Sequence, residues 1–78
     1  MNEIVKSKVR RIVAAVLRVP AAELDDGAAL CKTERWDSLA QLDILASMEQ
    51  EFGMAIEPDE ALDLTTLAAL IAHVETHA

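Results

Sequence analysis

Apolar residues recur every three or four positions over residues 3–18, the spacing that places side chains on one face of an α-helix. This apolar face comprises Ile4, Val5, Val9, Ile12, Val13, Val16 and Leu17. Pro20 then disfavours helical backbone at the preceding residue, Val19. The pattern therefore predicts a first helix over residues 3–18.

A second helical pattern covers residues 38–52 and stops at Gly53, a residue type that favours helix ends. The connection between the first two helices, residues 19–36, is long for so small a domain. Leu24 and Leu30 are expected to anchor this connection to the core. Connections of this length often carry function in compact domains.

Two shorter helical segments follow. Residues 58–62 begin with Pro58, which suits the first turn of a helix, and predict a short third helix. Thr65 or Thr66 is expected to cap a fourth helix that runs to about Thr76. Only 3% of the residues are aromatic, so the core must be aliphatic, a composition that favours helices over strands. The pattern thus predicts an all-α four-helix bundle with a long loop between helices one and two and a short third helix.

The second helical segment carries two apolar stripes when its residues are placed at steps of about 100°. The first stripe, expected to face the core, is formed by Ile44, Leu45, Met48 and Phe52. The second stripe, on nearly the opposite face, is formed by Leu39, Leu42 and Ala46, and it is flanked by Asp43, Glu49 and Gln50. An apolar centre with a charged rim is typical of a protein interface. Alternatively, residues 19–36 fold over part of the second stripe.

Charge divides the chain into two unlike halves. All seven Lys and Arg lie in residues 1–35, which also hold five acidic residues and so carry a net charge of +2. Residues 36–78 hold nine acidic residues and no Lys or Arg, a net charge of −9. Such a field repels nucleic-acid phosphates and attracts basic protein surfaces. Protein partners are therefore expected, and nucleic acid is not.

Length and cysteine usage bound the function further. The 78 residues fit a single domain, residues 1–78, that is too small for a large enzyme cleft. The single cysteine, Cys31, cannot build a disulfide framework, and no Cys/His cluster has the spacing of a zinc site, so a reduced cytoplasmic compartment without a metal centre is expected. No segment approaches the ~20 apolar residues that span a bilayer, so membrane insertion is not expected. A monomer is expected.

The tetrapeptide Trp36-Asp37-Ser38-Leu39 stands where the irregular connection gives way to the second helix. A helix N-terminus offers unpaired N–H groups and the positive end of the dipole, so a phosphate on the Ser38 hydroxyl would gain about 0.3–1 kcal/mol there. The simpler interpretation is that Asp37 or Ser38 caps the helix. A serine hydrolase is disfavoured, because the Gly-x-Ser-x-Gly turn is missing.

Three segments resemble a known family. Asp37-Ser38-Leu39 before the helix, Glu51-Phe52-Gly53 at its end and Leu64-Thr65-Thr66-Leu67 beyond it are similar to acyl and peptidyl carrier proteins of the phosphopantetheine-binding family. The similarity covers nearly the whole chain and is strongest over residues 36–67. It implies a four-helix bundle whose Ser38 receives 4′-phosphopantetheine from coenzyme A through a magnesium-dependent phosphopantetheinyl transferase. The thiol of this arm would carry acyl or aminoacyl groups as thioesters, and the carrier itself would catalyse nothing.

The same resemblance assigns roles around Ser38. Asp37 matches the position that the transferase recognises. Contacts with the transferase, with an acyl- or aminoacyl-loading enzyme and with a downstream synthase or transferase would fall to Leu39, Leu42, Asp43, Ala46 and Glu49. Contacts with the arm or its cargo would fall to Ile56, Ala61 and Leu62 near the third helix, and to Trp36. For Trp36, packing over the loop is the simpler interpretation.

Three residues depart from the pattern of carriers in fatty-acid synthesis. Trp36 replaces a glycine, and Ala40 and Gln50 replace acidic residues. Because charges at an interface rim tune the choice of partner, a dedicated polyketide, nonribosomal-peptide or specialised lipid pathway is expected. A housekeeping carrier of fatty-acid synthesis is the alternative, and an unmodified acidic helical adaptor is the alternative from another class.

Overall fold

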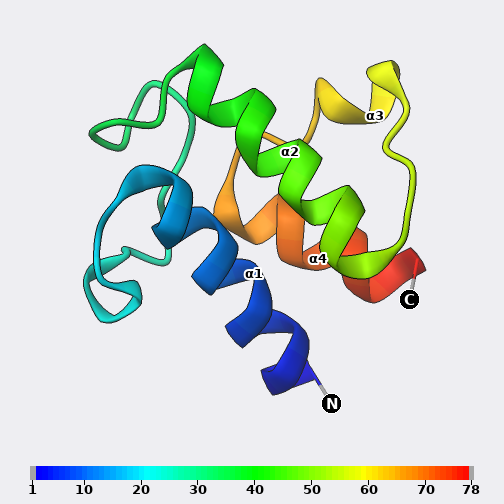
Figure 1. Cartoon of the computed structure of the whole chain (residues 1–78), viewed down its shortest axis with the longest axis horizontal. Helices are drawn as coiled ribbons and strands as arrows, with labels where there is room; N and C mark the ends of the chain where they lie inside the picture. The colour runs from blue at the N-terminus through cyan, green and yellow to red at the C-terminus, as the bar shows by residue number, and fades with distance from the viewer. Residues whose placement is uncertain (1, 78) are drawn as a thin grey trace.

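The computed structural model of the chain describes residues 2–77, with the side chains of residues 3–76. Its elements are α1 (Asn2–Leu17), a 3-10 turn η1 (Ala21–Glu23), α2 (Ser38–Phe52), α3 (Pro58–Ala61) and α4 (Leu67–His77) (Figure 1). The predicted all-α bundle with a short third helix is confirmed. The predicted bounds of α2 agree with the structure, and those of the other helices differ by about one residue. Among the described residues, no helix is long and apolar enough to cross a membrane.

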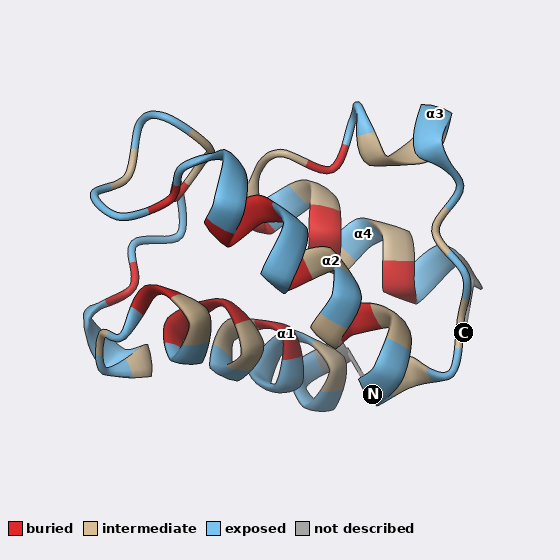
Figure 2. Ribbon diagram, turned by 45° about the horizontal axis from the view of Figure 1, so that its top comes forward, coloured by how far each residue is buried: buried red, intermediate tan, exposed pale blue. Residues whose placement is uncertain are grey.

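Helix α1 organises the core, since it contacts both α2 and α4. Buried positions gather where these three helices face one another (Figure 2). From α1 the fully buried side chains are Val9, Val13 and Leu17, whereas Ile4, predicted to share their face, is exposed. Arg18 has a left-handed backbone conformation (φ 61°), so α1 ends one residue earlier than the sequence predicted.

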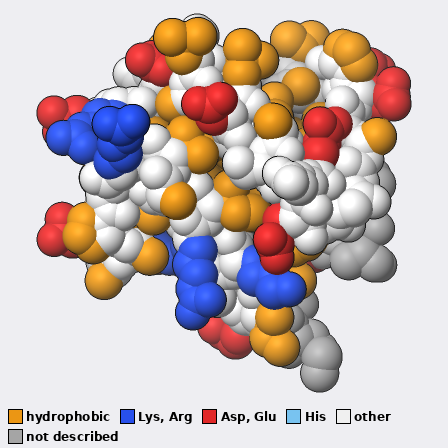
Figure 3. Space-filling model, in the orientation of Figure 1, with side chains coloured by type: hydrophobic (Ala, Val, Ile, Leu, Met, Phe, Trp, Pro, Cys, Tyr) orange, Lys and Arg blue, Asp and Glu red, His pale blue; other side chains and the backbone are white. Residues whose placement is uncertain are grey.

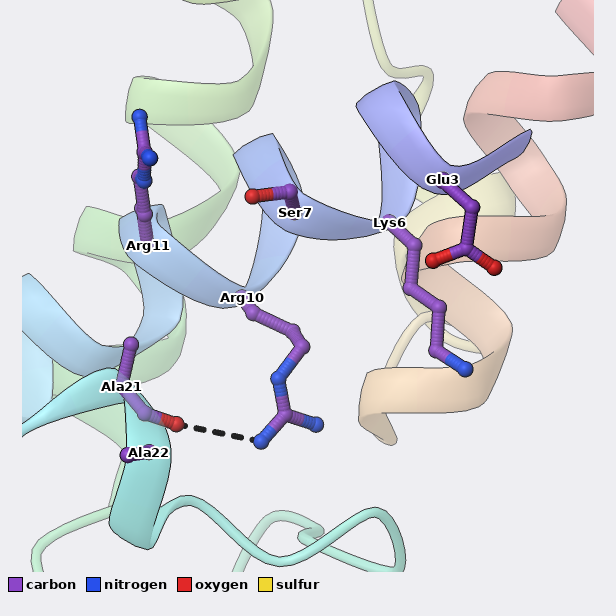
Figure 4. A pocket seen from close by; sticks show the side chains of 7 residues that line it. All are labelled: Glu3, Lys6, Ser7, Arg10, Arg11, Ala21 and Ala22. Carbon is purple, nitrogen blue, oxygen red and sulfur yellow. Dashed lines mark hydrogen bonds between the residues drawn. The ribbon is translucent and has the colours of Figure 1, made fainter. Parts of the chain in front are cut away.

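The connection between α1 and α2 is held at both of its ends. Near α1, Arg10 Nη2 donates to the carbonyl oxygen of Ala21 (Figure 4). Arg10 Nη2 also donates to the Leu24 carbonyl, and Arg10 Nη1 lies 2.6 Å from Asp26 Oδ1. Closer to α2, Arg35 Nη1 donates to the Arg18 carbonyl at 3.2 Å. As predicted, Leu24 is buried in the core.

The middle of the same connection pairs with the segment between α3 and α4. Leu30 N–H donates to the Thr65 carbonyl at 2.8 Å, and Leu67 N–H donates to the Ala28 carbonyl at 3.0 Å. The connection therefore lies against the start of α4. Of the two capping threonines proposed from the sequence, Thr66 caps α4, because its hydroxyl oxygen accepts from Ala69 N–H at 3.0 Å.

Helix α2 ends at Gly53 as predicted. Gly53 is left-handed (φ 60°, ψ 40°) and its N–H donates to the Glu49 carbonyl. Glycine adopts this conformation without the steric cost that a Cβ imposes. The turn directs the chain toward α3, which lies along the same edge of the bundle as the start of α2 (Figures 1 and 2).

Candidate functional site

Ser38 is the first residue of α2, and Asp37 is its N-cap. The Asp37 backbone is extended, and its carboxylate oxygen Oδ1 accepts from Ala40 N–H at 2.9 Å. Of the two capping candidates from the sequence, Asp37 is therefore the cap. Ser38 is exposed, and none of the described residues makes a hydrogen bond to its hydroxyl. The hydroxyl is thus available to an incoming reagent.

The anion-binding end of α2 already holds one negative charge. The Asp37 carboxylate accepts a hydrogen bond from Ala40 N–H, and the Asp37 carbonyl accepts one from Gln41 N–H. A phosphate on Ser38 would share the remaining first-turn N–H groups and the positive dipole end with this carboxylate. Because Asp37 caps the helix, the free-energy gain that the dipole gives to a phosphate on Ser38 is smaller than for an uncapped helix end.

The second stripe of α2 is a solvent-exposed apolar surface. Leu39 is 74% exposed and Leu42 64%, and Ala46 is exposed beside them. Leu62, which follows α3, is 78% exposed. Figure 3 shows hydrophobic side chains along this upper edge, over α2 and α3, with acidic side chains among them. The predicted exposure is confirmed, and the alternative that residues 19–36 cover the stripe is wrong.

The carboxylates predicted to flank this surface differ in their surroundings. Asp43 is exposed on α2. Glu49 is half-buried, and its Oε2 accepts from Ile56 N–H at 2.7 Å, which fastens the chain between α2 and α3. Glu49 therefore has a structural contact that the sequence did not reveal. Ile56 and Ala61 are half-buried, so the residues near α3 that are expected to contact the arm range from half-buried to exposed.

Trp36 is a core residue and not a surface one. Its side chain is 1% exposed, and its Nε1–H donates to Gln41 Oε1 at 2.7 Å. An arm in solvent has no access to this ring. The packing interpretation of Trp36 therefore replaces the predicted contact with arm or cargo.

Sequence reasoning missed Gln41. This side chain is 7% exposed, and its Nε2 donates to the Leu64 carbonyl at 2.6 Å, so both ends of the amide are used inside the core. One signal could have found it: Gln41 precedes the buried residues Ile44 and Met48 by three and seven positions, the spacing of one helix face.

Ala40, one of the two positions where the sequence lacks an expected acidic residue, is buried at the start of α2. Its side chain belongs to the buried core cluster. Packing against the core therefore accounts for a small apolar residue at this position, independently of any partner. Leu45 and Phe52, predicted to face the core, are half-buried at its edge. The buried face of α2 is therefore centred on Gln41, Ile44 and Met48.

The comparison with known families agrees with this geometry. A family model described as a phosphopantetheine attachment site matches residues 7–74. The chain therefore belongs to this family, whose domains carry covalently attached 4′-phosphopantetheine. Domains of this kind are carriers that work with transferases and synthases. Within the described residues, no group of three or more His, Cys, Asp or Glu side chains is placed to hold a metal ion.

Proposed function

We propose that Ser38 is the residue to which the arm is attached and that the chain delivers acyl or aminoacyl thioesters to partner enzymes. The observation that carries this proposal is the exposed Ser38 hydroxyl at the first residue of α2, beside an exposed apolar surface. The neighbouring hydroxyl on the same helix, Ser47, is half-buried and lies in the second half of α2, away from its N-terminus. Family membership favours this carrier function over an unmodified adaptor.

In the attachment step, the Ser38 oxygen attacks the phosphorus that bears pantetheine in coenzyme A and forms a phosphodiester. The pyrophosphate bond to the adenosine half breaks, 3′,5′-adenosine bisphosphate leaves, and the hydroxyl proton passes to a base of the transferase. Asp37 presents a carboxylate next to the reacting oxygen, held in place by Ala40 N–H. This fixed acidic group suits recognition by a basic transferase surface. Once attached, the arm supplies a thiol that bears the substrate and keeps it at high effective concentration near each partner.

The exposed apolar surface is proposed to contact the partners. Leu39, Leu42 and Ala46 supply the apolar centre, and Asp43 supplies charge at its rim. On the α3 side, Leu62, Ile56 and Ala61 are proposed to lie along the arm. In this proposal the chain itself has no catalytic residue and acts as a monomer.

A dedicated pathway is proposed in preference to housekeeping fatty-acid synthesis. Its support is the small number of acidic side chains that α2 offers to a partner. Gln50 is exposed and uncharged, and the Glu49 carboxylate accepts a hydrogen bond from Ile56 N–H. Rim charge mainly sets association rate and partner choice. The holo chain is expected to be a poor substrate for a fatty-acid-synthesis acyltransferase, and Gln50→Glu is expected to raise kcat/KM. Wild-type turnover equal to that of the housekeeping carrier would support the alternative.

Incubation with coenzyme A, magnesium and a broad-specificity phosphopantetheinyl transferase tests the carrier function. The intact mass is expected to increase by one phosphopantetheinyl group, and a loading enzyme is then expected to form a hydroxylamine-sensitive thioester. A folded chain that takes up no arm would support the unmodified adaptor.

A further inference from the structure

A buried hydrogen-bond chain crosses the interior beneath Ser38. It runs from Trp36 Nε1 to Gln41 Oε1, and from Gln41 Nε2 to the Leu64 carbonyl. All three residues are buried. The chain of hydrogen bonds, called here the Gln41 relay, connects the end of the α1–α2 loop, the first turns of α2 and the segment between α3 and α4.

The segment between α3 and α4 is fastened from a second side. Leu30 N–H donates to the Thr65 carbonyl, and the Ala28 carbonyl accepts from Leu67 N–H. These bonds and the Gln41 relay hold residues 64–67 against both the loop and α2. Moving residues 64–67 outward, away from both the loop and α2, would therefore break hydrogen bonds on two sides of the segment.

The interior between these elements is filled with side chains. Ile44 and Met48 of α2 and Leu67 and Leu70 of α4 are fully buried in one apolar cluster. Two open pockets, of about 400 and 210 Å³, lie against α1, the first beside η1 and the second beside Glu51 near the end of α2. The larger is lined by charged and small residues of α1 and η1 (Figure 4), and neither includes a residue of α3.

We propose that the Gln41 relay closes the bundle beneath Ser38, so that cargo on the arm stays outside the protein. This inference rests on the proposed attachment of the arm to Ser38. For an apolar chain to insert between α2 and residues 64–67, it would have to part Gln41 from Leu64 and leave buried polar groups without partners. It would also have to displace close-packed side chains.

The closed interior defines a class of cargo. A long alkyl chain gains stability by leaving water, and a bundle that does not admit it provides no such gain. Short acyl groups and polar ones, including aminoacyl and hydroxyacyl groups, have little apolar surface to hide. The carrier is therefore suited to short or polar acyl groups.

A chain-length series tests this inference. The apo chain is loaded by the transferase with acetyl-, hexanoyl- and decanoyl-coenzyme A, and intact mass confirms each product. Cleavage of each thioester by hydroxylamine is then compared with cleavage of the same acyl group on free pantetheine. Equal rates, within about twofold, are expected at every length, because burial would protect longer chains progressively.

Protection of the decanoyl thioester by more than about tenfold would overturn the inference and leave the proposed function intact, since burial of methylene groups is the source of such protection. A chain that gains no mass in the loading step would instead overturn the proposed function and the inference with it. The mass spectrum recorded before hydroxylamine is added distinguishes the two results.

Two variants test the relay itself. Gln41→Leu has a similar volume but lacks both hydrogen bonds, and it is expected to protect the decanoyl thioester several-fold relative to wild type. The same substitution at an exposed site of α2, Gln50→Leu, is expected to leave the rate unchanged. Trp36→Phe removes the indole donor and so breaks only the first hydrogen bond of the relay, and a smaller protection of the decanoyl thioester is expected. Unprotected cargo in both relay variants would show that the relay does not close the bundle.

Discussion

The indole nitrogen of Trp36 donates a hydrogen bond to Gln41 Oε1 at 2.7 Å, and both side chains are buried. The bond joins the end of the α1–α2 loop, one residue before the N-cap Asp37, to the first turns of α2. Because Trp36 is fixed inside the bundle, the chain leaves the core directly after it, and Asp37 and Ser38 are exposed at the start of α2. An interior contact thus sets the position of the candidate attachment site.

Trp36→Phe is expected to lower the free energy of unfolding by about 1–3 kcal/mol, because Gln41 Oε1 loses its donor while remaining buried. Urea denaturation monitored by circular dichroism measures this loss. In a double-mutant cycle with Gln41→Leu, the double variant is expected to lose less unfolding free energy than the sum of the losses in the two single variants, since each variant breaks the same bond. Strict additivity would contradict the coupling.

Asp37 is expected to have two separable roles, and two substitutions distinguish them. Asp37→Asn keeps a side-chain oxygen for Ala40 N–H, so stability should be retained while the transferase loses its acidic contact and kcat/KM falls. Asp37→Ala should lower both, with a loss of about 0.5–2 kcal/mol in unfolding free energy. Equal transferase kinetics for wild type and Asp37→Asn would show that Asp37 acts through capping alone.

Leu42→Asp is expected to lower kcat/KM with a cognate partner about tenfold, because it places a charge in the apolar centre of the proposed interface. The unfolding free energy should change by less than about 0.5 kcal/mol, since Leu42 is exposed.

Asp43→Lys should also weaken turnover, with an effect that shrinks as salt is added. Glu23→Lys makes the same charge change on η1 and serves as the matched control. If Glu23→Lys and Asp43→Lys had equal effects, net charge and not the α2 surface would explain the result.

Glu49→Ala is expected to cost about 0.5–1.5 kcal/mol of unfolding free energy, through loss of the hydrogen bond to Ile56 N–H. Glu49→Gln retains an acceptor oxygen and should cost less. Hydrogen exchange of the Ile56 amide reports the contact directly and should accelerate in Glu49→Ala. The exposed neighbour provides the control, since Gln50→Ala should leave that amide unchanged.

The sequence predicted the helices well because local spacing and helix-end residues determine them. Gly53 ends α2, and the apolar period of α1 defines its buried face. What the sequence did not determine was which of two neighbouring residues makes a given hydrogen bond. Either Asp37 or Ser38, and either Thr65 or Thr66, satisfied the capping preference, and only the backbone geometry selects one of each pair.

The errors at the start of α2 have one physical origin. Gln41 and Ala40 are buried because the loop brings Trp36 underneath the first turns of the helix, and this contact is not encoded in the spacing of α2 alone. A polar residue such as Gln41 looks like a solvent-facing position until its partners, Trp36 and the Leu64 carbonyl, are in place. The exposed stripe was predicted correctly because its own spacing defines it.

Peptide-level mass spectrometry after incubation with coenzyme A and the transferase tests the central claim most directly. The phosphopantetheinyl group is expected on the peptide that contains Ser38, in wild type and in the matched variant Ser47→Ala, and it should be absent from a folded Ser38→Ala chain. An arm still present on Ser38→Ala, or located on another residue of the wild type, would contradict the assignment of Ser38 as the attachment site.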